Sequence, residues 1–448
     1  MKLIIIPLVL IAAVAAVILA LAQRPGGLEA VYGDAAARAT SEAATAIALV
    51  APTATPIPPP TATRMPIPPE LHEVMTTVEK QVSELRGLNP MADVPEFFLT
   101  REQFRDHYKR TMQENVPIEE VHQYIEQLYL LRLVSSPAID FYEASADLYS
   151  DGILGYYDHI SKELYVVTDR PLELNAESKV TLAHEFVHNL QDQHYKLKKI
   201  WPTNAKDRDR NLAIQSLVEG DATLSGYAYA AIYMDGADFS SLFDKREVSQ
   251  AVEDRTPPYL SMTTIFPYTA GTAFAARLLE VARFSTINLA LTDPPRSTEQ
   301  IMHPEKYLQT PADHPLAVGL PELQGPLGEG WELKETNTLG EFDLNMMLRL
   351  NGASDPDRGA DGWGGGKFAM YKLAHEVLVY AATTWDTLDD ASQFTGAMTE
   401  SFGKAEKQGE YWVDNGRHFW MHQKGKRVTF ISSTNRPALE RVVGAEAK

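Results

Sequence analysis

The sequence predicts an α+β protein in which a mostly helical domain with a small sheet is followed by a C-terminal α+β unit. Apolar residues recur at helical spacing at Val180, Ala183, Val187 and Leu190, and a second helical stretch is predicted from about Asn211 to Tyr233. Aromatic and β-branched residues around a polar turn, from Gly155 to Val167, indicate a hairpin. From about Gly328 onward the pattern changes to short strand-like segments.

The N-terminal segment is predicted to export the chain. Leu3 to Ala22 is apolar and uncharged, and about 20 such residues span a bilayer as a helix. We expect an anchor that crosses the cell membrane once and leaves the remainder extracytoplasmic. The alternative is a signal cleaved after Ala20-Leu-Ala22, which would give a secreted protein beginning at Gln23.

The next segment, residues 23–68, is rich in Ala, Thr and Pro and is predicted to be a disordered linker, because it cannot bury enough apolar surface to fold. The remaining chain is long enough for two domains. We place the first domain at 69–327 and the C-terminal unit at 328–448.

Charge and cysteine content restrict the function. The net charge of −19 argues against nucleic acid as a partner, since phosphate binding needs a basic face. Cysteine is absent, so any metal site must use histidine and carboxylate ligands.

The first helices of the folded part carry no visible chemistry. Helical periodicity begins near Pro69, and Thr100-Arg-Glu-Gln103 has the pattern of a capping box. A further helix is predicted from Pro117 to about Leu133. The hairpin at 155–167 follows. Its edge is suited to receive an extended peptide, and a purely structural hairpin is the alternative.

The next stretch contains the pattern H-E-x-x-H at His184, Glu185 and His188. On a helix, residues four apart lie on one face, so both imidazoles can reach one zinc ion. Asn175 is the expected N-cap of this helix. Glu185 flanks the metal and is placed to take a proton from a water molecule, so it is the expected general base.

A third zinc ligand has two candidates. His194 lies at the spacing of the metzincin pattern, but Gln191 occupies the position where that pattern has glycine. Glu219, in the helix from about Asn211 to Tyr233, is the favoured candidate, because a carboxylate from a packed neighbouring helix would complete the site.

With these residues the sequence resembles the gluzincin group of zinc metallopeptidases. The strings HEFVHNLQDQH, LVEGDA and STEQIMHPEKY are also similar to those of mostly uncharacterised bacterial, membrane-anchored, extracytoplasmic proteins of metallopeptidase type. The resemblance covers about Glu84 to Asp390. It implies a zincin-like fold, His184 and His188 as ligands, Glu185 as base and Glu219 as third ligand.

One position departs from the gluzincin pattern. Many gluzincins have an aspartate four residues after the ligand glutamate, where it orients a ligand histidine. Thr223 stands at that position here. Asp221 or Asp192 is therefore expected to orient a histidine.

Two later segments complete the catalytic domain. The helix from Phe266 to Leu279 has small residues that permit close packing. The segment Pro294 to Tyr307 contains His303, which we expect to stabilise the oxyanion that forms when water attacks a carbonyl. Tyr307 is the alternative donor.

The C-terminal unit is predicted to have strands near 368–373 and 377–382, a helix at 387–402, a hairpin within 411–431 and a final helix from Pro437. Asp361-Gly-Trp-Gly-Gly-Gly366 is predicted to be a turn, because it lacks the residues of a phosphate-binding loop.

These observations predict zinc-dependent hydrolysis of peptide bonds by an exported, membrane-tethered metallopeptidase. Its expected cofactor is Zn2+ and its expected partners are a peptide or protein substrate and the membrane. The alternative is a non-catalytic cell-surface binding or assembly module that retains the fold. Intact His184, Glu185, His188 and Glu219 favour the enzyme, because a binding module does not need the base.

Overall fold

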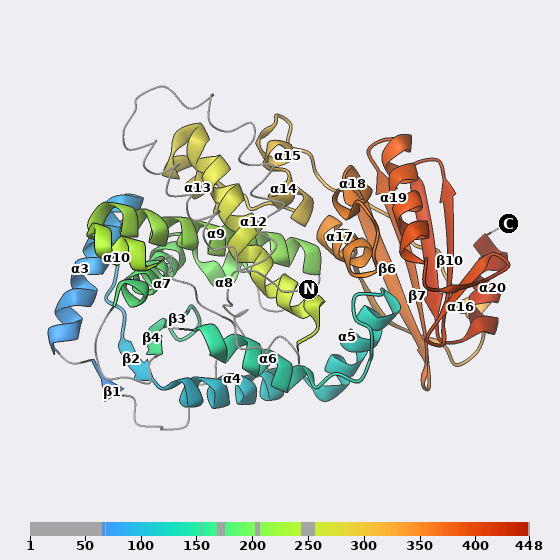
Figure 1. Ribbon diagram of the computed structural model, residues 1–448, viewed down its shortest axis with the longest axis horizontal. Coiled ribbons are helices and arrows are strands. Elements are labelled where there is room, and N and C mark those ends of the chain that lie inside the picture. The colour runs from blue at the N-terminus through green and yellow to red at the C-terminus, as the bar shows by residue number, and fades with distance from the viewer. Residues whose placement is uncertain are drawn as a thin grey trace. The chain divides into compact units, whose positions relative to one another are not determined.

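The computed structural model describes residues 65–67, 69–153, 155–167, 175–201, 207–242 and 256–446. Among them, two compact units separate: unit 1 takes the residues up to Asn115, Asp140–Asn204 and Ala213–Pro295, and unit 2 takes Val116–Ile139, Ala205–Leu212 and the residues from Arg296. The predicted α+β class is confirmed (Figure 1). The expected anchor lies outside the described residues, and no helix within them is long and apolar enough to cross a membrane.

Unit 1 is mostly helical and contains one small sheet. Its strands are β1 (Met65–Pro66), β2 (Glu96–Leu99), β3 (Gly155–Asp158) and β4 (Glu163–Val167), in the order β1-β2-β4-β3. Its helices are α3 (Pro69–Arg86), α4 (Arg101–Asn115), α6 (Phe141–Gly152), α7 (Ala176–Tyr195), α8 (Leu197–Ile200), α10 (Gly236–Ser241), α12 (Pro258–Ala282), α13 (Phe284–Ala290) and most of α9 (Arg208–Tyr233). The predicted hairpin is confirmed, because β3 and β4 pair antiparallel.

Helix α7 is the buried centre of unit 1. Asn175 caps it as predicted, since its side chain accepts a hydrogen bond from the Ser178 N–H at 2.9 Å. The predicted capping box of α4 is also confirmed by reciprocal bonds between Thr100 and Gln103. Apolar side chains from α3, the sheet and α9 pack with the apolar positions of α7 in one core, which includes Leu182, Phe186, Val187 and Leu190 of α7. This packing fixes the helix that carries the H-E-x-x-H pattern.

Helices α9 and α12 cross with their backbones in contact, as the small residues of α12 predicted. A Cβ on Gly220 would lie 2.1 Å from the carbonyl oxygen of Gly271, and a Cβ on Gly271 would lie 2.1 Å from that of Ser216. Only glycine fits both positions. Farther along α9, a Cβ on Gly226 would lie 3.3 Å from the Val180 carbonyl oxygen on α7. Glycines therefore bring α9 close to both neighbours.

Unit 2 is built on a seven-stranded antiparallel sheet with the strand order β5-β6-β7-β11-β10-β9-β8. The strands are β5 (Glu332–Thr338), β6 (Trp363–Leu373), β7 (Glu376–Trp385), β8 (Glu406–Gln408), β9 (Tyr411–Asp414), β10 (Arg417–Lys424) and β11 (Arg427–Ser433). The helices are α5 (Ile118–Leu130), α14 (Thr298–Met302), α15 (Pro304–Leu308), α16 (Gln324–Leu327), α17 (Glu341–Leu350), α18 (Pro356–Ala360), α19 (Leu388–Ser401) and α20 (Arg436–Glu446).

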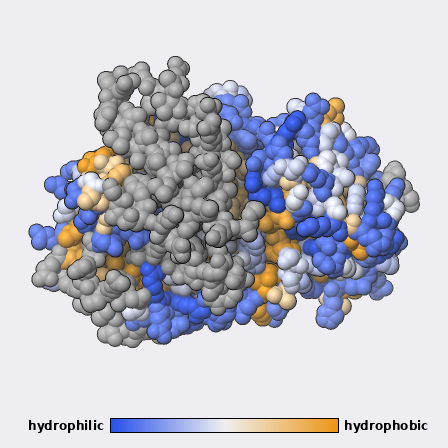
Figure 2. Space-filling view, viewed as in Figure 1, coloured by the Kyte–Doolittle hydropathy of each residue, from blue (hydrophilic) through white to orange (hydrophobic). Residues whose placement is uncertain are grey.

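Helices cover both faces of this sheet. Alternate strand residues such as Tyr371, Tyr380 and Ile431 pack with α16 and α20 in one core. Because neighbouring residues on a strand point to opposite faces, Phe419 lies on the other face, where its ring contacts Phe402 at the end of α19. On the side shown in Figure 2, hydrophilic residues predominate at the described surface of unit 2.

The glycine-rich stretch before Lys367 corrects one prediction. Gly364 to Gly366 lie inside strand β6 and do not form a turn. A Cβ on Gly365 would lie 2.4 Å from the Leu316 carbonyl oxygen, and one on Gly366 would lie 2.2 Å from that of Leu339. The glycines are explained by this close approach of other backbone segments.

Candidate metal centre

The two histidines of the pattern and the favoured glutamate converge within unit 1. His184 Nε2 and His188 Nε2 lie 3.0 Å apart. Each lies 3.2 Å from Glu219 Oε2. All three side chains are buried. Helix α7 supplies both imidazoles from adjacent turns, and α9 supplies the carboxylate.

These three atoms fit a tetrahedral metal ion. With metal–ligand distances of about 2.0 to 2.1 Å, the ligands of a tetrahedral zinc lie about 3.3 to 3.4 Å apart, close to the observed 3.0 and 3.2 Å. The three atoms, His184 Nε2, His188 Nε2 and Glu219 Oε2, form a triangle. Hydrogen bonds cannot account for all three of its edges, because each Nε2 carries at most one hydrogen and each hydrogen points along one edge. A cation between the atoms would satisfy all three.

The charges around this triangle favour a cation. Burial would lower the pKa of His188, but the Glu219 carboxylate outweighs burial and raises this pKa to about 9. Burial would raise the pKa of Glu219, but His188 and His184 lower it to about 2. The site therefore holds an ionised carboxylate that attracts positive charge, supplied here either by a proton or by a metal ion.

A hydrogen-bond relay fixes the tautomer of His188. Gln191 Nε2 donates to the Val218 carbonyl at 3.0 Å and to Asp221 Oδ2 at 2.8 Å. Because these two partners only accept, the amide oxygen of Gln191 must face His188, whose Nδ1 lies 2.9 Å away. His188 Nδ1 therefore carries a hydrogen. In the neutral ring, this leaves the Nε2 lone pair for a metal.

The relay ends in a buried ion pair. Arg86 donates from Nη2 to Asp221 Oδ2 at 2.9 Å, and both side chains are fully buried. Asp221 thus acts on His188 through Gln191. Asp192 bonds elsewhere: it accepts from the Tyr157 hydroxyl at 2.9 Å and from the Leu197 N–H at 3.1 Å. Of the two aspartates expected to orient a histidine, the structure connects Asp221.

Glu185 lies beside the triangle and is held by the sheet. Its Oε2 accepts a hydrogen bond of 2.8 Å from the backbone N–H of Tyr157 on β3. A Cβ on Gly155 of the same strand would lie 3.0 Å from Glu185 Cγ, so the glycine makes room for this side chain. Burial raises the pKa of Glu185, and the two histidines oppose this effect. The buried carboxylate is therefore a stronger base than an exposed one.

Tyr268 of α12 is a site residue that sequence reasoning missed. Its ring stacks on that of His184, with 6.1 Å between centroids. Its hydroxyl is buried and has no hydrogen-bond partner among the described residues. Burial and the neighbouring Glu219 raise its pKa well above the usual value, so the phenol keeps its hydrogen. Tyr268 therefore places a hydroxyl donor beside the triangle, close enough to the Glu219 carboxylate to be affected by it.

The other predicted residues lie elsewhere in the fold. His194 is at the end of α7, and its Nε2 contacts the Asn89 carbonyl at 2.8 Å. His303 belongs to unit 2, where its Nε2 contacts Glu341 Oε1 at 2.9 Å. Tyr307 lies in α15 of the same unit. The predicted roles of His303 and Tyr307 as oxyanion donors stay predictions, as does that of His194 as the alternative zinc ligand.

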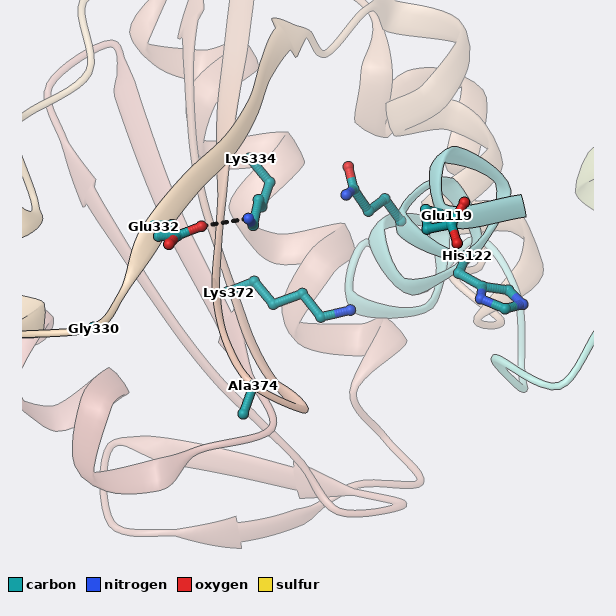
Figure 3. Close-up of a pocket in the computed structure, with 8 residues that line it drawn as sticks. Glu119, His122, Gly330, Glu332, Lys334, Lys372 and Ala374 are labelled. Carbon is teal, nitrogen blue, oxygen red and sulfur yellow. Dashed lines mark hydrogen bonds and ion pairs between the residues drawn. The ribbon is translucent and has the colours of Figure 1, made fainter. Parts of the chain in front are cut away.

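A cavity of about 370 Å³ lies in unit 2 between α5 and strands β5 and β6 (Figure 3). Each of its two lysines is matched by a carboxylate: Lys334 by Glu332 at 2.5 Å and Lys372 by Glu126 at 2.7 Å. The cavity thus presents no uncompensated ammonium group, which distinguishes it from an anion site.

Comparisons with known proteins touch only unit 2. A family described as Domain of unknown function (DUF8575) matches residues 330–443, which contain the seven-stranded sheet. No curated protein and no solved structure is significantly similar to the chain. The case for a function therefore depends on the residues themselves.

Proposed function

We propose that this protein is a zinc-dependent metallopeptidase whose active centre lies in unit 1. One observation carries the proposal: His184 Nε2, His188 Nε2 and Glu219 Oε2 form a triangle with edges of 3.0 to 3.2 Å beside the buried Glu185. Three protein ligands leave the fourth position of a tetrahedral ion open, as a catalytic zinc requires. When bound, zinc would lower the pKa of a water molecule and polarise the scissile carbonyl.

Glu185 is the proton carrier in this proposal. Its Oε2 is held by Tyr157, which leaves Oε1 to take a proton from the attacking water. The water oxygen bonds to the carbonyl carbon, the C–N bond breaks, and Glu185 returns the proton to the amine nitrogen that leaves. The products are a carboxylic acid and an amine, so atoms balance without any further reactant.

Tyr268 is the proposed donor to the oxyanion. A carbonyl that becomes tetrahedral gains negative charge on oxygen, and a fixed hydrogen-bond donor stabilises that charge. The buried Tyr268 hydroxyl meets the geometry of a hydrogen bond with none of the described residues, and the Glu219 carboxylate keeps it protonated by raising its pKa, so it is a suitable donor to an oxyanion beside the triangle.

The proposed substrate is a peptide or protein outside the cytoplasm. Export and membrane attachment are proposed from the apolar run Leu3 to Ala22. The chain should remain with membranes after alkaline washing, whereas release of a protein beginning at Gln23 would indicate a cleaved signal.

Zinc content and peptide hydrolysis, measured on the same preparations, test the proposal. Glu185→Gln keeps the shape but removes the base, so zinc content should stay constant while hydrolysis falls by about 10² to 10⁴. Glu219→Ala removes a ligand, so zinc affinity and hydrolysis should fall together. His194→Ala should retain zinc.

The matched control is Glu177→Gln, the same change at an exposed position in the first turn of α7. It should alter neither quantity. If the unmodified protein binds zinc but cleaves nothing in a broad peptide library, and Glu185→Gln has no effect, the binding-module alternative replaces the enzyme.

A further inference from the structure

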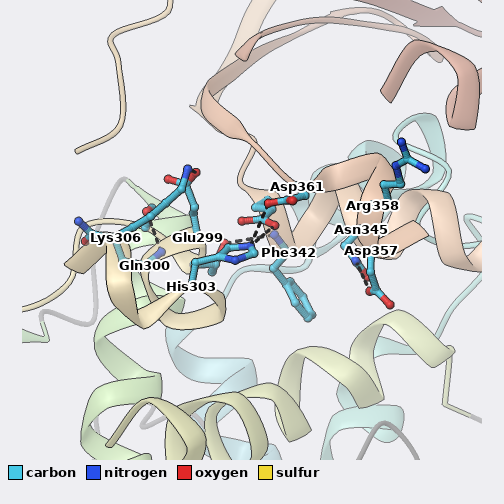
Figure 4. Close-up of polar contacts among 12 residues, drawn as sticks. Glu299, Gln300, His303, Lys306, Phe342, Asn345, Asp357, Arg358 and Asp361 are labelled. Atoms are coloured by element: carbon cyan, nitrogen blue, oxygen red, sulfur yellow. Dashed lines mark hydrogen bonds and ion pairs between the residues drawn. The ribbon is translucent and has the colours of Figure 1, made fainter. Parts of the chain in front are cut away.

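We propose that His303, Glu341 and Asp361 form a second divalent-cation site, located in unit 2. His303 lies between α14 and α15, Glu341 is the first residue of α17, and Asp361 follows α18. His303 Nε2 lies 2.9 Å from Glu341 Oε1 and 3.8 Å from Asp361 Oδ1. Figure 4 shows the ring of His303 directed toward Asp361. Three separate elements therefore bring potential ligands to one point.

The carboxylate of Glu341 carries the argument, because half of it is unsatisfied. Glu341 is 1% exposed, and its Oε2 has no hydrogen-bond partner among the described residues. No protonation state of the His303–Glu341 pair gives this oxygen a hydrogen-bond partner. An ionised Oε2 lacks a donor, and a protonated one lacks an acceptor.

In a neighbouring group of the same unit, a lysine balances the negative charge of the carboxylates. Glu299, Asp313 and Asp386 surround the ammonium group of Lys306, with Nζ–O distances of 2.5, 3.5 and 2.6 Å. A lysine thus supplies the cation there. The His303 group includes no lysine or arginine within ion-pair distance among the described residues. A bound cation would give the unpartnered Glu341 Oε2 a partner.

The ligand set indicates the class of ion. The imidazole nitrogen suits Zn2+ and the two carboxylate oxygens suit Mn2+, and these are the two ions we infer. Two carboxylates neutralise such an ion when His303 is neutral. The side chain of Asp361 is 63% exposed, so solvent can reach the site and complete the coordination. With Glu341 used as a ligand, the other buried carboxylate nearby among the described residues, Glu299, is engaged by Lys306. The site binds a cation and is not expected to catalyse a reaction.

The test compares metal content between two double variants of the full-length chain. His303→Gln with Asp361→Asn removes two ligands at partly exposed positions. The matched control, His375→Gln with Asp357→Asn, makes the same changes at two exposed positions in unit 2. Each protein is stripped of metal, equilibrated with Zn2+ or with Mn2+, and analysed by mass spectrometry of the elements. The ligand variant should bind about one equivalent less of at least one ion than the control.

The difference in metal content between the two double variants does not depend on the metal centre in unit 1, because neither variant changes a residue of that centre. A failure of the proposed peptidase site would lower both totals and leave the difference unchanged. Equal metal content in both double variants would overturn the proposal. If the ligand variant does not fold, Asp361→Asn alone suffices, since its exposed side chain tolerates the change; its metal affinity should be at least tenfold below that of Asp357→Asn, and equal affinities would overturn the proposal.

Discussion

Two groups in this protein join histidine to buried carboxylate: His184, His188 and Glu219 in unit 1, and His303, Glu341 and Asp361 in unit 2. In unit 1, an amide relay assigns the hydrogen of His188 to Nδ1, and a second buried glutamate stands beside the triangle. In unit 2, the histidine has no such relay, and its closest contact is the carboxylate itself.

The comparison teaches that similar ligand types can be prepared for different tasks. Both groups concentrate negative charge that a cation would balance. Among the described residues, the first group also has a base held by a backbone N–H, Glu185, and a hydroxyl donor, Tyr268, beside it. The two proposals therefore give proton transfer to unit 1 and cation binding alone to unit 2. Substitutions at single positions can remove these features one at a time.

The largest effect is expected where α9 crosses α12. Gly220→Ala places a Cβ 2.1 Å from the Gly271 carbonyl oxygen, so the helices must separate and Glu219 must move. We expect a loss of more than about 3 kcal/mol in the free energy of unfolding, at the upper end of overpacking effects, and loss of zinc from unit 1. Urea titration and metal analysis measure these changes.

The control for this variant is Gly396→Ala on α19, where a Cβ meets nothing within 4 Å. This change should stabilise the protein by roughly 0.5 to 1 kcal/mol. Equal stability of the two variants would show that the close crossing is not needed.

The second prediction removes the donor that has no counterpart in unit 2. Tyr268→Phe should lower kcat/KM for peptide hydrolysis by about 10², or about 2.7 kcal/mol, with zinc content unchanged. Tyr233→Phe, the same change on α9, should leave kcat/KM unaltered. A wild-type rate in Tyr268→Phe would assign the oxyanion to another donor.

Sequence reasoning located the residues that local geometry determines. His184, Glu185 and His188 share one helix, and four-residue spacing is sufficient to bring both imidazoles to one point. Glu219 required only the further expectation that a second helix packs on the first. The Gly–Gly crossing makes this packing possible, and the sequence signalled it only as a run of small residues in α12.

Residues that act over long sequence distances could not be predicted in this way. Arg86 and Asp221 are 135 positions apart, and no local pattern connects them. The sequence pattern marks Gln191 only as the residue that breaks the metzincin spacing. Because Gln191 follows His188 by three residues, however, the two side chains are neighbours on one face of the helix. Tyr268 enters the site because of where α12 crosses α9, which depends on tertiary packing.

A third histidine, His159, shows how burial changes the pKa of an imidazole when a neighbouring carboxylate compensates only in part. His159 is 2% exposed, stacks on Trp201, and its Nε2 has no hydrogen-bond partner among the described residues. Burial lowers its pKa from 6.5 to about 4, an effect that Asp192 opposes only in part. The unfolded chain therefore binds a proton at a higher pH than the folded protein does. Stability should be full above pH 6.5 and fall as the pH drops toward 4.

The expected loss from His159 between pH 7.5 and pH 5 is about 2 kcal/mol. His159→Phe keeps the ring stack on Trp201 but cannot take a proton, so urea titrations of this variant should show that much less acid sensitivity. Replacing the exposed His375 by Phe should leave the pH dependence as it is. The same acid sensitivity in both variants would show that His159 is not the group responsible.

The smallest expected effect concerns the relay that sets unit 1 apart. Gln191→Leu removes the acceptor of the His188 Nδ1 hydrogen while leaving the Arg86–Asp221 pair in place. The Nε2 lone pair is then no longer fixed toward the triangle, so zinc affinity should fall at least tenfold, or about 1.4 kcal/mol, as is usual when a partner of a ligating histidine is lost. Competition with a chelator measures the affinity.

Gln193→Leu makes the same change two residues along α7, where the amide bonds the backbone at Ala92, and should not change zinc binding. If Gln191→Leu also binds zinc as tightly as the unmodified protein, the triangle itself is sufficient, and the difference between the two histidine groups lies only in Glu185 and Tyr268.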